Sequence, residues 1–181
     1  MVGDVVQDWN GNSLMLRPGS YWHLTPAVGG LIRNNARAGK GVVYSVSAIA
    51  AQPGLSQAFT PYAAGAIGQP KEILWEQVRA QSYPALPSRL KSLYCFETKE
   101  IAERAAREWF GNEVRIPLEL RIGTAAIMHR CDAKLLEAPE SDWKQSAERY
   151  WKGEMTAKPV PETIVHGPVY FPGWEQFPIG F

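Results

Sequence analysis

Three polar residues lie in aromatic, strand-like runs and could act together in chemistry. His23 lies in YWHLTP, Tyr94 in SRLKSLYCF and Glu162 in VPETIVHGPVYF. A carboxylate can stabilise a developing positive charge, a histidine can hydrogen-bond a hydroxyl, and an aromatic ring can stack on a planar ligand. Each residue also has a structural explanation: a core histidine, a core ring and a solvated charge at a strand start. Their order along the chain makes the set more informative than its members.

Other catalytic and metal-binding patterns have weaker support. The sequence has no GxGxxG, Walker, HExxH or GxSxG motif and no paired CxxC. A zinc site would require residues at irregular spacing to converge, namely His129, Cys131, Asp132 and His166. A hydrolase that uses Cys95 is unsupported, because a small cysteine in an apolar strand is more often simply buried. We therefore expect no metal.

The three runs resemble the motifs of the ADP-ribosyltransferase superfamily of the His-Tyr-Glu type. In that family an early strand carries a His in a context similar to YHxT. YWHLT matches this context except that Trp22 separates Tyr21 from His23. A later strand carries a Tyr and leads into a helix, as in SLYCFETKEIAERAAREWF, and a Glu opens a last strand, as in PETIVHGPV. The resemblance extends over roughly residues 20–170 by the order of elements.

The resemblance implies an NAD-dependent ADP-ribosyltransferase. Such an enzyme breaks the bond between nicotinamide and ribose, and it transfers ADP-ribose to an acceptor, so NAD is a substrate. Glu162 would be the catalytic carboxylate that stabilises the oxocarbenium-like ribose, His23 would hydrogen-bond the adenosine ribose, and Tyr94 would stack on nicotinamide. Glu154, in a loop, is the second candidate for this acid. We prefer Glu162 because strands hold a side chain more rigidly than loops.

Further residues of the same motifs would contact NAD. Thr25 closes the YWHLT motif beside His23. Arg33, Arg37 or Arg89 could contact the pyrophosphate, because a guanidinium presents paired donors to phosphate. The spacing does not decide between these arginines.

The sequence leaves the acceptor and the biological role open. A protein or a nucleic acid could receive ADP-ribose, and a toxin, a phage-encoded modifier and a host-defence factor are equally compatible with the sequence. One alternative is an NAD glycohydrolase, in which water is the acceptor. Another is a non-catalytic module that binds a protein partner through an aromatic cleft and the uncharged run at residues 50–70.

The predicted elements indicate an α+β fold with a mostly antiparallel split sheet and flanking helices, as in ADP-ribosyltransferases. Thr25 is expected to cap the first helix, with Pro26 at its first position, and Ser141 to cap the last. We expect His23, Tyr94 and Glu162 to face one cleft of the sheet. Strands are predicted at 21–24, 42–46, 92–96, 113–122, 124–129 and 162–171, and helices at 27–39, 71–81, 98–110 and 141–153.

Length and composition favour one cytoplasmic domain. The 181 residues predict a single domain, 1–181, with an irregular lead-in at 1–19 and an aromatic, Pro-rich tail at 172–181. A net charge of +1 argues against a strongly basic nucleic-acid binder. Two cysteines favour a reducing compartment. The absence of an apolar run of about 20 residues or of a basic leader predicts no membrane partner.

Overall fold

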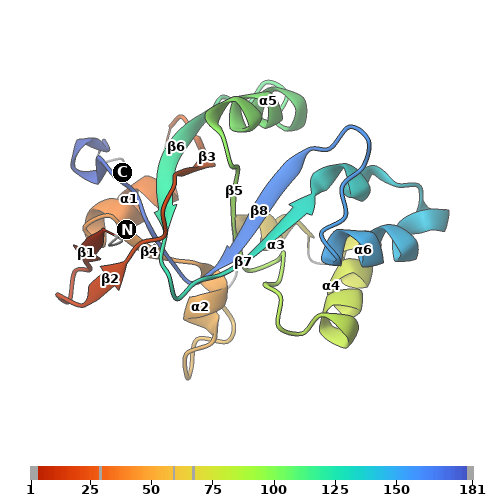
Figure 1. Cartoon of the computed structure of the whole chain (residues 1–181), viewed down its shortest axis with the longest axis horizontal. Coiled ribbons are helices and arrows are strands. Elements are labelled where there is room, and N and C mark those ends of the chain that lie inside the picture. Colours follow the sequence, from red (N-terminus) through yellow and green to blue (C-terminus); the bar gives the residue numbers. More distant parts are fainter. Residues whose placement is uncertain (1–3, 29, 59, 67, 179–181) are drawn as a thin grey trace. The chain divides into compact units, whose positions relative to one another are not determined.

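The computed structural model describes residues 4–28, 30–58, 60–66 and 68–178. The chain divides into two compact units that alternate along the sequence, so it passes from one unit to the other four times. Unit 1 comprises residues 1–44, 95–126 and 167–181, and unit 2 comprises residues 45–94 and 127–166. Each unit is built from its own sheet and helices (Figure 1). The prediction of one domain over 1–181 stays a prediction.

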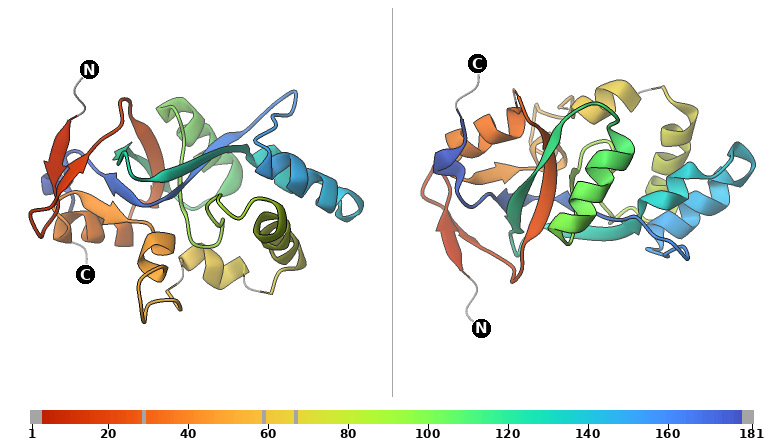
Figure 2. Two further views of the ribbon diagram at one scale, coloured as in Figure 1. Left: turned by 60° about the horizontal axis from the view of Figure 1, so that its bottom comes forward. Right: turned by 90° about the horizontal axis from the view of Figure 1, so that it is seen from above.

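Unit 1 contains a four-stranded antiparallel sheet with the strand order β3–β6–β9–β4. Helix α5 packs on β3 and β6 (Figure 2, right). Leu24, Phe96, Ala102 and Ala105 form a small core there. The sheet strands are β3 (Tyr21–Pro26), β6 (Arg115–Ile122), β9 (Pro168–Tyr170) and β4 (Val42–Tyr44). The other elements are the hairpin of β1 (Val5–Gln7) and β2 (Ser13–Met15), the helices α1 (Leu31–Ala38) and α5 (Lys99–Trp109), and the 3-10 helix η3 (Trp174–Gln176).

Unit 2 contains a three-stranded sheet with the order β5–β8–β7 and a hydrophobic core that includes Trp75, Tyr150 and Trp151. Helices α4 and α6 pack against each other, and the indole of Trp151 donates a hydrogen bond of 2.8 Å to the carbonyl of Trp75. The strands are β5 (Leu93–Cys95), which ends at the boundary with unit 1, β8 (Pro161–His166) and β7 (Ile127–Asp132). The helices are α2 (Val46–Ala50), α3 (Pro61–Ala66), α4 (Pro70–Ser82), α6 (Trp143–Trp151), η1 (Ala133–Glu137) and η2 (Glu140–Asp142).

The strand that carries His23 is longer than the sequence predicted. Thr25 and Pro26 pair with β6 as the last two residues of β3, so the prediction that Thr25 caps a helix beginning at Pro26 is wrong. Helix α1 instead begins at Leu31, with Gly30 in the N-cap position. Pro26 is tolerated because β3 lies at the edge of its sheet, where a missing backbone N–H leaves no second neighbour unsatisfied.

The predicted strand 162–171 is in fact two strands in two sheets. Gly167, with φ 128°, interrupts the run; β8 lies before it in unit 2 and β9 after it in unit 1. The two extended runs around Gly123 also separate, because β6 pairs with β3 and β9 while β7 pairs with β8. The prediction of an α+β fold with antiparallel sheets and flanking helices is confirmed.

Local capping explains the other differences. The predicted lead-in contains the β1–β2 hairpin, and β4 ends at Tyr44 because Ser45 caps α2. Ser141 lies in η2, and α6 begins at Trp143 with Asp142 as its N-cap, so the prediction of a Ser141 cap is wrong. Thr98 caps α5, since its hydroxyl accepts a hydrogen bond from the Ile101 amide.

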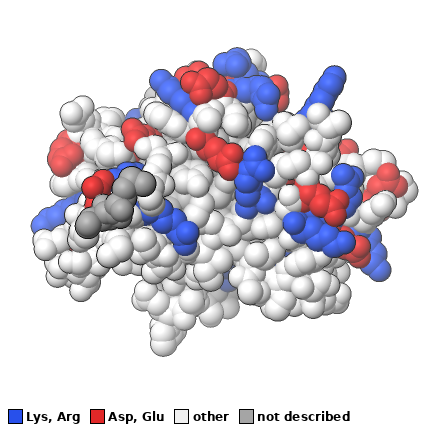
Figure 3. Space-filling view, viewed as in Figure 1, with Lys and Arg blue, Asp and Glu red and all other residues white. Residues whose placement is uncertain are grey.

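The surface charges are unevenly distributed over individual elements. Figure 3 shows cationic and anionic side chains interspersed over α5. The segment after α2, residues 51–70, contains no charged residue in the sequence.

None of the helices in the described ranges is long and apolar enough to cross a bilayer.

Candidate functional site

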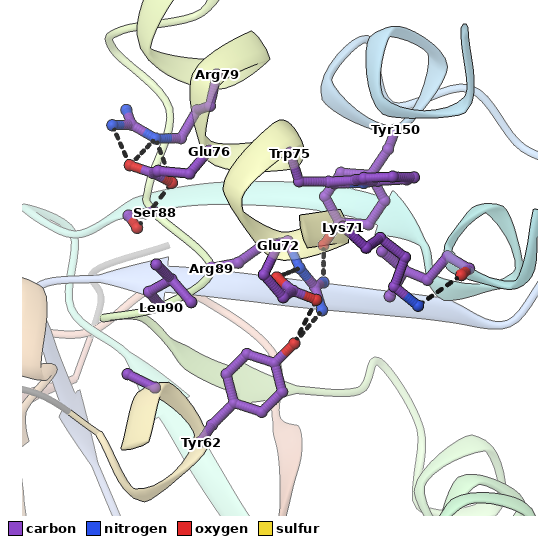
Figure 4. A network of polar contacts seen from close by, with 12 residues as sticks. Tyr62, Lys71, Glu72, Trp75, Glu76, Arg79, Ser88, Arg89, Leu90 and Tyr150 are labelled. Atoms are coloured by element: carbon purple, nitrogen blue, oxygen red, sulfur yellow. Dashed lines mark hydrogen bonds and ion pairs between the residues drawn. The ribbon is translucent and has the colours of Figure 1, made fainter. Parts of the chain in front are cut away.

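The centre of unit 2 holds a buried polar group around Arg89 (Figure 4). Its guanidinium, in a residue only 4% exposed, donates through Nη1 to Glu162 Oε1 at 2.7 Å and to the Tyr150 hydroxyl at 2.6 Å. Nη2 donates to the Tyr62 hydroxyl at 3.1 Å, and Nε lies 3.4 Å from Glu72 Oε2. With Tyr94, whose ring faces the same guanidinium, these residues form what we term the Arg89 cluster.

The carboxylate of Glu162 is held by one of its two oxygens. Oε1 accepts from Arg89 and, at 2.8 Å, from the Tyr150 hydroxyl, and the Cys131 thiol lies 3.9 Å away. Among the residues that the structure describes, none donates a hydrogen bond to Oε2. Two charge-assisted hydrogen bonds therefore fix the group, while its second oxygen retains its acceptor capacity.

Glu162 is buried because of the strand on which it lies. Strand β8 is the middle strand of its sheet, with Cys131 of β7 opposite Glu162, and the side chain is 3% exposed. A buried carboxylate requires a counter-charge and hydrogen-bond donors. Arg89, in the loop between α4 and β5, supplies both.

A second polar network holds the loop that carries Arg89 (Figure 4). Arg79 pairs with Glu76 one turn away on α4 and also donates to the carbonyls of residues 84 and 86. The Ser88 hydroxyl donates to Glu76 at 3.0 Å, and the Tyr94 hydroxyl donates to the Arg89 carbonyl. The position of the guanidinium is thus set by contacts with α4 and β5.

Three tyrosine rings surround the guanidinium of Arg89. Its Cζ lies 5.1 Å from the ring centroid of Tyr150, 5.5 Å from that of Tyr94 and 5.8 Å from that of Tyr62. Burial raises the pKa of Tyr150 and of Tyr94 well above the usual value, although Arg89 opposes the shift. Burial likewise raises the pKa of Tyr62 to about 12. All three phenols therefore remain protonated hydrogen-bond donors at neutral pH.

Tyr62 reaches the cluster from α3, which lies within the uncharged run at residues 50–70. The Thr60 hydroxyl accepts from the Ala63 amide and donates to the Leu90 carbonyl, each at 2.9 Å. This contact fixes the start of α3 beside the Arg89 loop. The Tyr62 hydroxyl then donates to Glu72 Oε1 at 2.7 Å.

The loop that leads into β8 is held by Asp132 at the end of β7. Its carboxylate accepts hydrogen bonds from the Lys134 amide, the Val160 amide and both the amide and hydroxyl of Thr156, at 2.7–2.9 Å. Burial raises the pKa of Asp132, but the bonds from Thr156, Val160 and Lys134 together lower it below the usual value. The ionised carboxylate thereby sets where β8, and Glu162 with it, begins.

The structure brings three of the predicted site residues together. Arg89, Tyr94 and Glu162 all belong to the Arg89 cluster of unit 2, whereas His23 lies in unit 1. His23 is opposite Leu118 in the β3–β6 ladder. The expectation that His23, Tyr94 and Glu162 face one cleft stays a prediction.

Among the other residues of unit 1 that are predicted to contact NAD, Arg33 and Arg37 have structural partners. Thr25 is buried, and the guanidinium of Arg33 donates to the carbonyls of Pro26 at 3.2 Å and Ala27 at 2.9 Å. Arg37 donates to two carbonyls of the C-terminal segment, those of residues 175 and 177. Arg33 thus supports the turn after β3, and Arg37 holds the C-terminal segment.

The two candidate catalytic acids differ sharply in their surroundings. Glu154 is exposed in the turn after α6 and pairs with Arg149 at 3.0 Å, whereas Glu162 is buried and held by a strand. An exposed pair contributes little to rigidity. The structure thus gives Glu162, and not Glu154, a fixed carboxylate.

The residues considered for zinc have other contacts. His129 hydrogen-bonds the Tyr150 carbonyl at 3.0 Å and stacks on Trp151. Burial lowers the pKa of His129, although the bond to Tyr150 and the charge of Glu162 oppose this shift. Within the described ranges, no group of three His, Cys, Asp or Glu side chains could hold a metal ion.

Sequence reasoning missed Tyr62, Glu72 and Tyr150. Glu72 gives a signal in retrospect, because it shares the buried face of α4 with Trp75 and Val78, and a charge on such a face implies a buried partner. Tyr150 lies in the apolar stripe of α6 and is indistinguishable from a core ring by spacing. Nothing in the uncharged run around Tyr62 predicts its contact with Arg89.

The chain was compared with the sequence models of known protein families. Residues 47–172, more than half of the chain, match the family model described as "Protein of unknown function (DUF2441)". The chain belongs to the DUF2441 family. No curated protein matches the chain. The DUF2441 segment contains the whole Arg89 cluster, whereas His23, Thr25 and Arg33 precede it.

Proposed function

We propose that this DUF2441 protein is an NAD-dependent ADP-ribosyltransferase, with Glu162 as its catalytic carboxylate. The observation that carries the proposal is the state of that carboxylate: Oε1 is fixed by Arg89 and Tyr150, and Oε2 has no donor among the described residues. A group that must stabilise a transient charge has to be rigid and has to keep one acceptor for the substrate. Glu162 meets both requirements.

The proposal includes an ADP-ribosyltransferase-like fold, supported by the order of elements. The strand with His23 is followed by α1, the strand with Tyr94 is followed by α5, and Glu162 is the second residue of β8. The two antiparallel sheets, of four and three strands, agree with a split arrangement. The DUF2441 match begins after His23, so the Tyr94 and Glu162 motifs lie inside the matched segment and the His23 motif lies outside it.

The proposed reaction exchanges one bond at the ribose. The bond between the nicotinamide nitrogen and ribose C1′ breaks, and its electron pair leaves with neutral nicotinamide. The ribose develops oxocarbenium character, and an acceptor atom forms the new bond to C1′ and loses its proton. Glu162 Oε2 would accept a hydrogen bond from a ribose hydroxyl. Its buried negative charge acts more strongly on the developing cation than an exposed charge would.

The remaining roles follow from the resemblance. Tyr94 would stack on nicotinamide, His23 would hydrogen-bond the adenosine ribose, and Arg33 or Arg89 would contact the pyrophosphate. The acceptor is a protein or a nucleic acid, and water replaces it if the enzyme is a glycohydrolase. In this proposal Tyr150 is a positioning residue, since it contacts Glu162 and not the substrate.

The test is nicotinamide release from NAD⁺ labelled in its adenylate, with and without cell lysate as a source of acceptor. Glu162→Gln should keep NAD⁺ affinity nearly unchanged and lower turnover by about 10²-fold or more, because the lost interaction forms mainly in the transition state. Release without transfer of label would indicate a glycohydrolase.

The matched control is Glu154→Gln, which removes an exposed acid from the same unit. It should alter transfer to the acceptor more than nicotinamide release. If Glu154→Gln abolishes both activities and Glu162→Gln neither, the two acids are assigned the wrong way round. If folded wild-type protein neither binds NAD⁺ at millimolar concentration nor releases nicotinamide, the transferase proposal fails and the binding-module alternative stands.

A further inference from the structure

A pocket opens beside the Arg89 cluster within unit 2. It has a volume of about 550 Å³ and is lined by residues of α3, by the start of α4 and by the first residue of α6. This volume is in the range of small-molecule sites. Two aromatic rings, Tyr62 and Trp143, contribute to its lining, as do Gln69, Lys71 and Glu72.

Glu72 gives this pocket an incompletely compensated negative charge. Glu72 and Glu162 are 7% and 3% exposed, and both contact the single guanidinium of Arg89. Arg89 lies 2.7 Å from Glu162 and 3.4 Å from Glu72, so two buried carboxylates share a single positive charge and Glu72 is the more distant of them. The close partner of Glu72 is the neutral phenol of Tyr62, at 2.7 Å.

The neighbouring lysine does not supply the missing charge. Lys71 donates to the Leu136 carbonyl at 3.0 Å, and Figure 4 shows its side chain directed away from Glu72. Within the described ranges, the only ion pair recorded for Glu72 is the long contact with Arg89. A buried carboxylate in this position is stabilised by any further cation that can reach it.

We infer that this pocket binds a planar organic cation, an amidinium or guanidinium group, with its charge against Glu72. A planar cation can pair with both carboxylate oxygens and can also stack on the Tyr62 or Trp143 ring. A neutral ligand gains neither interaction in full. This binding site does not depend on the proposed transferase activity.

The test compares benzamidine with benzamide, its neutral isostere, by titration calorimetry and by the change in tryptophan fluorescence. Benzamidine should bind measurably and benzamide at least about tenfold more weakly, since only the cation forms a charge-assisted hydrogen bond. Glu72→Gln should weaken benzamidine by about tenfold or more and leave benzamide unchanged. Glu137→Gln, which removes an exposed acid elsewhere in unit 2, should change neither.

Two further variants keep the inference testable if Glu72→Gln does not fold. Tyr62→Phe keeps the ring and frees Glu72 Oε1, so benzamidine should bind as tightly as before or more tightly. Trp143→Leu removes an aromatic face and should weaken benzamidine by about threefold. Equal binding of benzamide and benzamidine, or weaker binding of benzamidine to Tyr62→Phe, would overturn the inference.

The cationic group could belong to an arginine side chain of a macromolecule or to a small molecule. A blocked Ala-Arg-Ala peptide distinguishes these two sources. If it binds as tightly as benzamidine, the ligand is a side chain of a macromolecule; if only benzamidine and agmatine bind, it is a small molecule. None of these readouts requires NAD⁺ turnover, so failure of the pocket and failure of the proposed activity are separable.

Discussion

At the scale of single residues, the Arg89 cluster is defined by unequal sharing of one guanidinium. Nη1 serves Glu162 and Tyr150, whereas Nε reaches Glu72 only at 3.4 Å. Buried ion pairs give little net stability, but removal of one partner is costly because it leaves the other uncompensated. The cluster is therefore sensitive to any change at Tyr150, which contacts both Arg89 and Glu162.

Tyr150→Phe should lower the free energy of unfolding by about 1–3 kcal/mol, because it removes the donor to Glu162 and the acceptor of Arg89 in a fully buried site. Urea titration followed by tryptophan fluorescence measures this. Tyr83→Phe is the control, since Tyr83 packs on the same core and its hydroxyl bonds no other described residue. Equal effects of the two variants would mean that the Tyr150 hydroxyl contributes nothing specific.

At the scale of elements, the sequence predicts best where local signals agree. The helix after Thr98 is correct because its cap, its period and its ending glycine all point to the same bounds. The run 162–171 was predicted as one strand because its residues favour a strand on both sides of Gly167. It forms two strands because β8 and β9 pair with partners in different sheets. The register of a strand depends on partner strands that are distant in the sequence. The local sequence of a strand therefore does not reveal which strand it pairs with.

The candidate site was predictable only in part for the same reason. Glu162 and Tyr94 stand out through their motifs, and Arg89 through its charge. Tyr62 and Tyr150 join them through helices whose packing no local spacing specifies. The residues that can carry chemistry were visible in the sequence, whereas the partners that hold them were set by tertiary packing.

Asp132 accepts the hydrogen bonds that hold the segment before β8. Asp132→Asn should therefore lower the free energy of unfolding by about 1–3 kcal/mol. An amide cannot accept from the amide and hydroxyl of Thr156 as well as from Val160 and Lys134. Chemical denaturation at pH 7 measures this loss. Asp142→Asn, which changes an exposed acid with one side-chain bond to Ser141, should cost far less.

The stability that the Asp132 carboxylate contributes should depend on pH. The pKa of Asp132 is lowered in the folded state, so its contribution is fully present above the ordinary carboxyl value of 3.8 and is lost as pH falls through the lowered pKa. Asp132→Asn should therefore show a flatter loss of stability in acid than the wild type. An identical slope in both proteins would contradict this role.

At the scale of the whole molecule, the chain joins its two units by four passages, and two of these passages meet. Ile127 pairs with His166 at one end of the β7–β8 ladder, and Gly167 lies against Ala126. A single glycine thus allows two chain segments to leave the unit 2 sheet side by side. Neither unit is continuous in sequence, so a change at this point affects segments of both.

Gly167→Ala should therefore destabilise the protein by about 2 kcal/mol or more, because φ is 128° and a Cβ would lie 2.9 Å from the Ala126 Cα. The backbone of residue 126 cannot yield without disturbing the β6–β7 passage. Gly173→Ala is the matched control, since its φ is also positive, at 73°, but no atom lies within 4 Å of the added carbon. It should cost only about 1 kcal/mol of backbone strain. Thermal unfolding of both variants separates the cost of backbone strain from the cost of the close contact with Ala126. An equal fall in melting temperature would show that the close contact with Ala126 is unimportant.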